Sequence, residues 1–250
     1  MPSFEFTTWQ WLIAFTAAYT IGVSKTGFAG VGLVGIYLMT EIMPARESTG
    51  VTLPLIVFAD VCVIRLYYRE ARWPLIRAFL PWAILGIFIG YLLFARIPEN
   101  RFRAVVGAII LVLVAGQYLR RWLLPTPRPG GPHPAAGIGL GLVGGINTMI
   151  ANSAGPFMAM YLLLDPTLSK WAFVGTNAMM FLIINTTKLP LSYSLGVINS
   201  KSLLFNLCLV PAVLAGIASG RFILERISQR VFEEVLLLFC LFAAIRLLWS

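Results

Sequence analysis

The sequence contains few charged residues. Only 12% of its 250 residues are Asp, Glu, Lys or Arg, whereas 59% are hydrophobic and the mean hydropathy is +0.85. A soluble globular chain carries about 25% charged residues, so this composition excludes an ordinary soluble domain. Long apolar runs separated by short polar segments predict instead an all-α polytopic membrane protein.

Residue types that commonly perform catalysis or bind metals are also scarce. The three cysteines fall in apolar runs without metal-like spacing, and His133 is the only histidine. The segment 151–155 therefore lacks the histidine base that an intramembrane serine protease would need near Ser153. The segment 24–26 lacks the preceding glycines of a phosphate-binding loop. We predict no enzymatic activity, no cofactor and no metal site.

Acidic residues are about half as frequent as basic ones, 10 against 19, which gives a net charge of +9. The basic residues lie mostly in short loops between apolar runs, which is typical of topology signals and lipid contacts rather than of a nucleic-acid surface. We therefore expect membrane lipids as partners and no nucleic acid. The distribution of lysine and arginine between alternate loops modestly favours an orientation with both termini outside.

One apolar run, Trp9 to Met39, is too long for a single membrane crossing, because an α-helix rises about 1.5 Å per residue and the hydrocarbon core is about 30 Å thick. Four glycines and Lys25 interrupt this run within Ile21–Gly32. A lysine at membrane depth costs about 2.5–3.5 kcal/mol on insertion scales, so it needs a partner or a function. Non-helical backbone at that depth is tolerated only inside protein or beside water. A broken helix with a buried cation predicts an anion site.

A second glycine-rich run, Ala135 to Met149, leads into a predicted break between Gly144 and Pro156. It follows a segment rich in proline and glycine, residues 123–134, which is the one obvious linker. The two halves share a pattern of residues, which indicates an internal repeat. At an offset of 130, Pro81, Gly86 and Gly90 recur as Pro211, Gly216 and Gly220, and at smaller offsets Gly22, Gly32, Thr52 and Asp60 correspond to Gly145, Gly155, Asn177 and Asn185.

Each half is predicted to hold a broken or re-entrant helix pair followed by three transmembrane helices. Each then crosses the membrane an odd number of times, so the second half is inverted relative to the first, as in many secondary transporters. The predicted bounds are 1–122 for the first repeat, 123–134 for the linker and 135–250 for the second, within one membrane domain. The remaining predicted spans are Thr49–Tyr68, Leu75–Ala95, Ala104–Leu119, Trp171–Thr187, Leu203–Leu224 and Val231–Trp249, with a turn-rich connection from Lys188 to Lys201.

The two breaks are the predicted site. A helix that restarts after a break directs N–H groups and its positive dipole end at the cavity, which suits an anion. The predicted substrate-binding residues are Lys25, Thr26, Gly27, Thr52, Asn147, Asn152, Ser153, Gly155 and Asn177. Asp60 is the candidate carrier of a coupling proton, and an ion pair with Lys25, Arg65 or Lys188 is the alternative. Close helix packing is the alternative explanation of the glycines.

The segment Gly22–Gly30, its counterpart Asn147–Pro156, the proline-rich central loop and a length of about 250 residues in two halves resemble the sulfite exporter TauE/SafE family of membrane transporters. The resemblance implies transport of a small sulfur-containing or organic anion, such as sulfite or a small sulfonate, at the bacterial inner membrane. It also implies that an ion gradient drives transport without ATP. The residues it implicates are Lys25, Thr26 and Gly27, with Asn147, Asn152 and Ser153 opposite.

We therefore predict a secondary active transporter of a small sulfur-containing anion that works by alternating access, with proton or ion coupling. Its expected location is the cell inner membrane, and a homodimer is left open. The alternatives are an anion channel, a transporter of a small carboxylate and a non-transporting membrane scaffold.

Overall fold

The computed structural model describes residues 6–28, 31–93, 111, 115, 132–198 and 200–249. These residues form helices and no strand, which confirms the all-α prediction. The helices are α1 (Thr8–Lys25), α2 (Val31–Ile42), α3 (Ala45–Tyr67), the 3-10 helix η1 (Tyr68–Glu70), α4 (Trp73–Leu93), α6 (Pro134–Ala151), α7 (Gly155–Leu163), α8 (Lys170–Ser194), α9 (Ser200–Arg226) and α10 (Gln229–Trp249).

Within the described ranges, three helical segments are long and apolar enough to cross a membrane, namely Glu47–Glu70, Trp73–Leu93 and Ser202–Arg226. Large apolar side chains such as Leu92, Leu204 and Leu207 are exposed on these helices. Lipid tails solvate such side chains as well as a protein interior does. The composition and the exposed apolar surface therefore both indicate a membrane protein.

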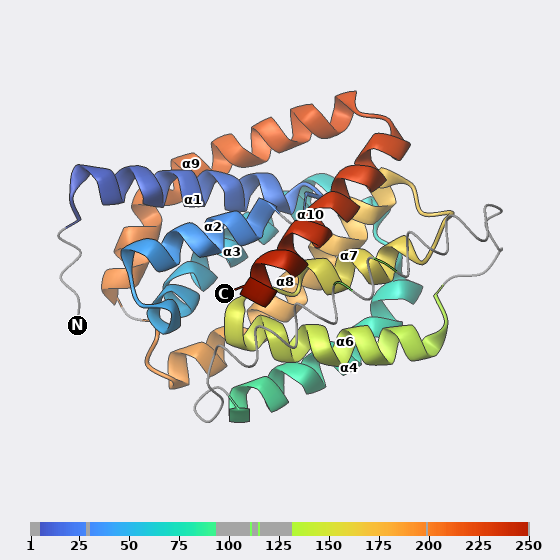
Figure 1. Cartoon of the computed structure of the whole chain (residues 1–250), viewed down its shortest axis with the longest axis horizontal. Coiled ribbons are helices and arrows are strands. Elements are labelled where there is room, and N and C mark those ends of the chain that lie inside the picture. The colour runs from blue at the N-terminus through green and yellow to red at the C-terminus, as the bar shows by residue number, and fades with distance from the viewer. Residues whose placement is uncertain are drawn as a thin grey trace.

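The helices pack in two lateral pairs around a central pair (Figure 1). Helix α1 lies along α9 on one side of the molecule, and α4 lies along α6 on the other. Between them, α3 contacts α8. The central pair therefore meets helices from both lateral pairs, and side chains of α3 and α8 that face inward are shielded from lipid.

Glycines permit the close approach in both lateral pairs. A Cβ atom at Gly22 of α1 would collide with the backbone at Val213 of α9, and one at Gly145 of α6 would collide with the backbone at Ala83 of α4. Small residues are the usual means of bringing membrane helices together, because lipid provides no hydrophobic driving force between them. The glycines of the long runs therefore serve first as packing surfaces.

The same type of contact occurs at corresponding positions in the two pairs. Gly216 approaches the carbonyl of Tyr19, and Gly86 approaches the carbonyl of Leu142. Gly86 and Gly216 are predicted counterparts at the offset of 130. The predicted inversion and the repeat bounds 1–122 and 135–250 nevertheless stay predictions. Most of the linker 123–134 and nearly all of the span Ala104–Leu119 lie outside the described residues.

Two predicted boundaries were wrong. Helix α6 continues through Gly144 and Gly145 to Ala151, because these glycines pack against α4 and α7 rather than ending the helix. Helix α8 continues past Lys188 to Ser194, with Pro190 inside it. A proline removes one hydrogen bond of the helix, and the packed helix tolerates that loss.

The packing role of Gly145 is testable by substitution. Gly145→Ala should lower the free energy of unfolding by about 1–3 kcal/mol, because the added methyl must displace the backbone of α4. Gly139→Ala on the same helix is the matched control, since nothing lies within 4 Å of a Cβ atom there. The control should be neutral or stabilising, because alanine favours helix over glycine by about 1 kcal/mol. Melting temperatures of the purified proteins in detergent would test this, and equal effects would contradict it.

Candidate functional site

The first break follows directly after Lys25, the last residue of α1. The hydroxyl of Ser24 donates to the carbonyl oxygen of Ile21 at 2.7 Å, and that of Thr26 donates to the carbonyl oxygen of Val23 at 2.8 Å. Gly27 has a φ of 112°, which L side chains rarely adopt. The chain therefore leaves the helix at Gly27, and α2 begins at Val31.

The second break spans Asn152 to Ala154, between α6 and α7. Asn152 adopts a left-handed conformation with a φ of 52°, and asparagine is among the few residues other than glycine that tolerate it. The side-chain amide of Asn147 donates to the carbonyl oxygen of Ser153 at 3.0 Å. Helix α7 then begins with Gly155 and Pro156, a position where proline is favoured.

One small cavity lies between the two breaks. Its walls come from α1, α2, α3, the second break, α7 and α8, and it is lined by Ile21, Ser24, Lys25, Gly32, Ile36, Ile56, Asn152, Ser153, Gly155, Phe181 and Asn185. Its volume is about 30 Å³, room for roughly two water-sized molecules. Two of the lining residues, Gly32 and Gly155, lie in the first turns of α2 and α7. The cavity therefore adjoins two helix N-termini.

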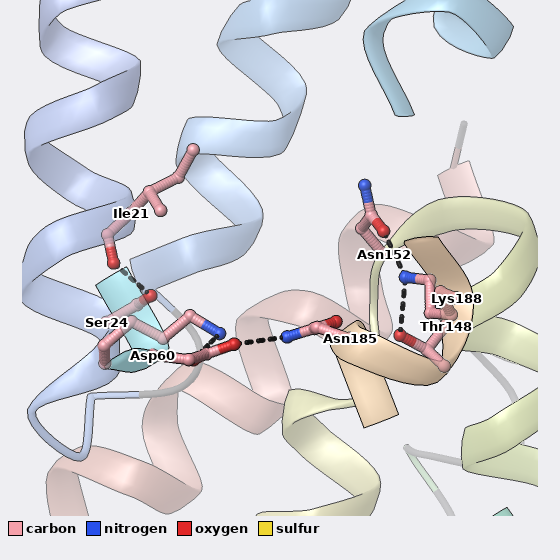
Figure 2. Close-up of polar contacts among 8 residues, drawn as sticks. Ile21, Ser24, Asp60, Thr148, Asn152, Asn185 and Lys188 are labelled. Atoms are coloured by element: carbon pink, nitrogen blue, oxygen red, sulfur yellow. Dashed lines mark hydrogen bonds and ion pairs between the residues drawn. The ribbon is translucent and has the colours of Figure 1, made fainter. Parts of the chain in front are cut away.

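Lys25 and Asp60 form a buried ion pair on one side of this cavity. The Nζ of Lys25 lies 2.8 Å from Oδ1 of Asp60, and both side chains are almost fully buried, with exposed fractions of 6% and 0%. The amide of Asn185 donates to Oδ2 of Asp60 at 2.6 Å (Figure 2). The ammonium of Lys25 also lies 3.8 Å from the ring centre of Phe181. Of the partners considered for Asp60, the structure therefore selects Lys25.

Lys188 is a second buried lysine, and its hydrogen-bond partners are neutral. Its Nζ donates to Oγ1 of Thr148 at 3.3 Å and to Oδ1 of Asn152 (Figure 2). The side chain is 1% exposed, and no carboxylate in the described part of the chain forms an ion pair with it. Asn152 also lines the cavity. The side chain of Asn152 therefore lies between Lys188 and the cavity.

Asn152 links Lys188 to α3. Its side-chain amide donates to the carbonyl oxygen of Thr49 at 2.9 Å and lies 3.3 Å from Oγ1 of Thr52. These donated bonds orient its Oδ1 toward Lys188. The second break, α3 and α8 are thereby joined through one asparagine.

Asn177 is fully buried, and neither atom of its amide has a hydrogen-bond partner among the described residues. It lies three residues after Val174, which packs against Gly27, and four before Phe181, which contacts Lys25. Residues at these spacings share one face of a helix. Asn177 therefore lies on the face of α8 that covers the first break. An unpaired buried amide costs about 1–3 kcal/mol.

The predicted site residues fall into three positions. Lys25, Asn152, Ser153 and Gly155 line the cavity. Thr52 and Asn147 contact these lining residues through hydrogen bonds, and Asp60 contacts Lys25. Thr26, Gly27 and Asn177 lie at the first break or on the face of α8 that covers it, and they do not line the cavity. Binding roles for all of these residues stay predictions.

Lys188 was missing from the predicted set. The residues Lys188–Ser194 contain a lysine and a proline after an apolar run, which indicates a turn on local criteria. One signal was available in the spacing, because Phe181, Asn185 and Lys188 follow a helical period that extends the polar face of α8. Position on that face, rather than local composition, identifies Lys188 as a buried residue.

Apolar helices that enclose a charged cavity at two helix interruptions are typical of membrane transport proteins. A family model described as sulfite exporter TauE/SafE matches residues 12–247, nearly the whole chain. The chain therefore belongs to the sulfite exporter TauE/SafE family of membrane transporters. No curated protein and no solved structure gives a significant match.

The buried pair predicts a specific pattern of stabilities. Lys25→Met or Asp60→Leu alone should lower the free energy of unfolding by about 3–5 kcal/mol, because each leaves one uncompensated buried charge. The double variant Lys25→Met/Asp60→Leu should be more stable than either single variant, because it removes both members of the pair and strands neither charge without the other. Thermal unfolding in detergent would rank the three proteins.

The exposed pair Arg221–Glu225, whose charged atoms are 2.8 Å apart, provides the control. Glu225→Gln should change stability by no more than about 1 kcal/mol, because solvent screens an exposed pair. A double variant that is less stable than both single variants would contradict the assignment of Lys25 and Asp60 as each other's counter-charge.

Proposed function

We propose that the protein is a secondary transporter that carries a small sulfur-containing anion, such as sulfite or a small sulfonate, across the inner membrane by alternating access. The observation that supports this best is the cavity between the two breaks, which is flanked, among the described residues, by two buried lysines and one buried carboxylate. Buried cations at membrane depth are costly unless they serve binding or transport. Membership of the family supports transport of an anion.

In this proposal the two breaks supply complementary contacts to the anion. The first turns of α2 and α7 adjoin the cavity at Gly32 and Gly155, so their N–H groups and positive dipole ends favour a negative charge there. Lys25 provides an ammonium, and Asn152 and Ser153 provide polar groups.

Alternating access requires two halves that move relative to each other, and we propose that these are inverted repeats with the bounds predicted from the sequence. Helices α1 and α6 run in opposite directions in Figure 1, and each packs by a glycine against a helix of the other half. Asn185 donates a hydrogen bond to Asp60, its predicted counterpart in the first half. Such a contact between counterparts is expected beside a pseudo-twofold axis, where many transporters bind their substrate.

Asp60 is the proposed coupling group. Protonation would remove its negative charge and release the ammonium of Lys25, which lies 2.8 Å away, for the anion. Deprotonation would restore the ion pair and favour release of the anion. Binding of the proton then increases the affinity for the anion, and binding of the anion increases the affinity for the proton. Transport of both in the same direction requires this relation.

Transport by the reconstituted protein tests the proposed function. Liposomes that contain the protein and are loaded with unlabelled sulfite or methanesulfonate should accumulate the radiolabelled anion from outside, and the initial rate should saturate with concentration. Exchange of this kind indicates a carrier, whereas non-saturating flux without exchange would indicate a channel. Exchange of a small carboxylate but of no sulfur anion would overturn the proposed substrate class.

Asn177 offers a test that separates binding from folding. Asn177→Leu should reduce kcat/KM for the transported anion by about ten- to a hundredfold, the value of a hydrogen bond to a charged group. The same variant should unfold at an equal or higher temperature, because it removes an amide that has no partner among the described residues.

Asn206→Leu is the matched control, because the amide of Asn206 donates to the carbonyl oxygen of Val51 at 2.7 Å. This control should lower the melting temperature. A stabilised Asn177→Leu protein with undiminished transport would contradict a binding role for Asn177.

A further inference from the structure

Three phenylalanine rings cover the tip of the first break. The ring centre of Phe232, in the first turn of α10, lies 5.2 Å from that of Phe173 in α8 and 6.2 Å from that of Phe28. All three side chains are buried. A Cβ atom at Gly27 would lie 2.9 Å from Cε2 of Phe232. The ring of Phe232 therefore rests directly on the backbone of the first break.

This ring cluster lies along the same face of α8 as the cavity. Phe173, Asn177, Phe181 and Asn185 follow one another at intervals of four residues, which places them along one face of the helix. Phe181 and Asn185 line the cavity, and Phe173 contacts Phe232. Asn177, whose amide has no hydrogen-bond partner among the described residues, lies between the cavity and the ring cluster.

The ring cluster also lies near one end of the molecule, where α8 begins at Lys170 and α10 begins at Gln229. The N–H of Lys170 donates to Oε1 of Gln229 at 2.6 Å, so the starts of the two helices are joined. Phe173 and Phe232 each follow three residues later, which is less than one helical turn. Along α8, the ring cluster therefore separates Asn177 and the cavity from this end, which we call the Lys170 end.

The first break contacts α10 through apolar groups. The N–H of Gly27 donates to the carbonyl oxygen of Ser24 at 3.3 Å. The carbonyl oxygen of Phe28 accepts from the N–H of Val31 at 2.9 Å. These polar groups have partners within the break and the start of α2, and the contacts with Phe232 are made by the glycine backbone and a phenyl ring. The break would keep these hydrogen bonds if it moved away from α10, so such a movement avoids the cost of stranding these polar groups.

We propose that Phe232 is a gate that closes the cavity toward the Lys170 end, and that it opens when the first break moves away from α10. This inference rests on the proposed function, because alternating access needs a closed barrier on one side of the substrate at a time. The break belongs to the first predicted half, and Phe232 belongs to the second. Relative movement of the halves would therefore part them, and the amide of Asn177 would then face an anion that passes the gate.

A reversible cross-link across the gate tests the proposal. The variant Phe28→Cys/Phe232→Cys, in a protein whose three native cysteines are replaced by alanine, is bridged with a short bifunctional methanethiosulfonate, and the bridge is verified by intact mass. Exchange of labelled methanesulfonate by liposomes should fall to the level of protein-free liposomes, because the break can no longer leave α10. Dithiothreitol should restore the exchange rate of the unbridged variant.

The matched control bridges two rings of the same predicted half. Phe173→Cys/Phe232→Cys joins α8 to α10, whose first residues are already connected through Lys170 and Gln229. Bridging should leave its exchange rate equal to that of its own unbridged form. Both pairs lack the ring of Phe232, so loss of the ring does not account for a difference between them.

A second measurement detects access to Asn177 from one side. Asn177→Cys in the same cysteine-free protein is treated with membrane-impermeant 2-sulfonatoethyl methanethiosulfonate, and Arg230→Cys, at an exposed position, identifies the Lys170 end. Phe232→Ala should raise the reaction rate of the Asn177→Cys thiol about tenfold from that end alone, because loss of the ring shifts the population toward the open form.

Phe205→Ala is the control for the loss of a buried ring. Phe205 lies in α9, with its ring centre 5.4 Å from that of Phe6 and 5.6 Å from that of Trp11, away from the first break. This variant should leave the reaction rate unchanged. If Phe232→Ala does not fold, Phe232→Leu replaces it with a smaller expected increase.

The outcomes separate the gate from the function on which it rests. If the unmodified protein exchanges methanesulfonate, an undiminished rate in the bridged Phe28→Cys/Phe232→Cys protein would overturn the gate and leave transport intact. An unchanged reaction rate in the Phe232 variants, or an equal increase from both sides, would also overturn the gate. If the unmodified protein exchanges no anion, the proposed function fails, and the reaction rate of the Asn177→Cys thiol still decides whether Phe232 closes access to it.

Discussion

The contact of Asp60 with Lys25 and Asn185 is the interaction on which the rest of the structure depends. It joins the end of α1, the middle of α3 and the middle of α8 at a point where all three side chains are buried. Transfer of such charges from water costs several kcal/mol each, and the pair recovers this only with good geometry and further hydrogen bonds. Asn185 supplies such a bond. The surrounding helices must therefore pack closely enough to exclude lipid and hold these atoms in place.

Close packing in lipid explains why glycine occurs where it does. Without a hydrophobic force between membrane helices, contact depends on how near two backbones can come. Gly22 brings α1 onto α9, and Gly145 brings α6 onto α4. These contacts place the ends of α1 and α6, and hence both breaks, next to the central pair α3 and α8. The packing of the lateral pairs thus determines where the cavity lies.

The sequence was sufficient to predict the helical membrane fold and the two interruptions, because a lysine or a polar cluster inside an apolar run is costly and stands out. It did not give the ends of the helices. Gly144 and Gly145 continue α6, and Pro190 lies inside α8. Local propensity favours a break at these residues, and tertiary packing overrides it. Lys188 was considered only as a partner of Asp60 and not as a site residue for the same reason, since its burial depends on the face of α8 that it occupies and not on its neighbours in sequence.

Two groups near the cavity lack the partners that their burial requires within the described residues. The amide of Asn177 has no hydrogen bond, and Lys188 has no carboxylate in contact. Each lowers the stability of the fold, and an apolar residue in either position would remove that cost. Natural proteins depart from the most stable choice chiefly where function requires it. Neither group lines the cavity, but Asn177 covers the first break and Lys188 contacts the lining residue Asn152. We therefore interpret both as features that are kept for binding rather than for stability.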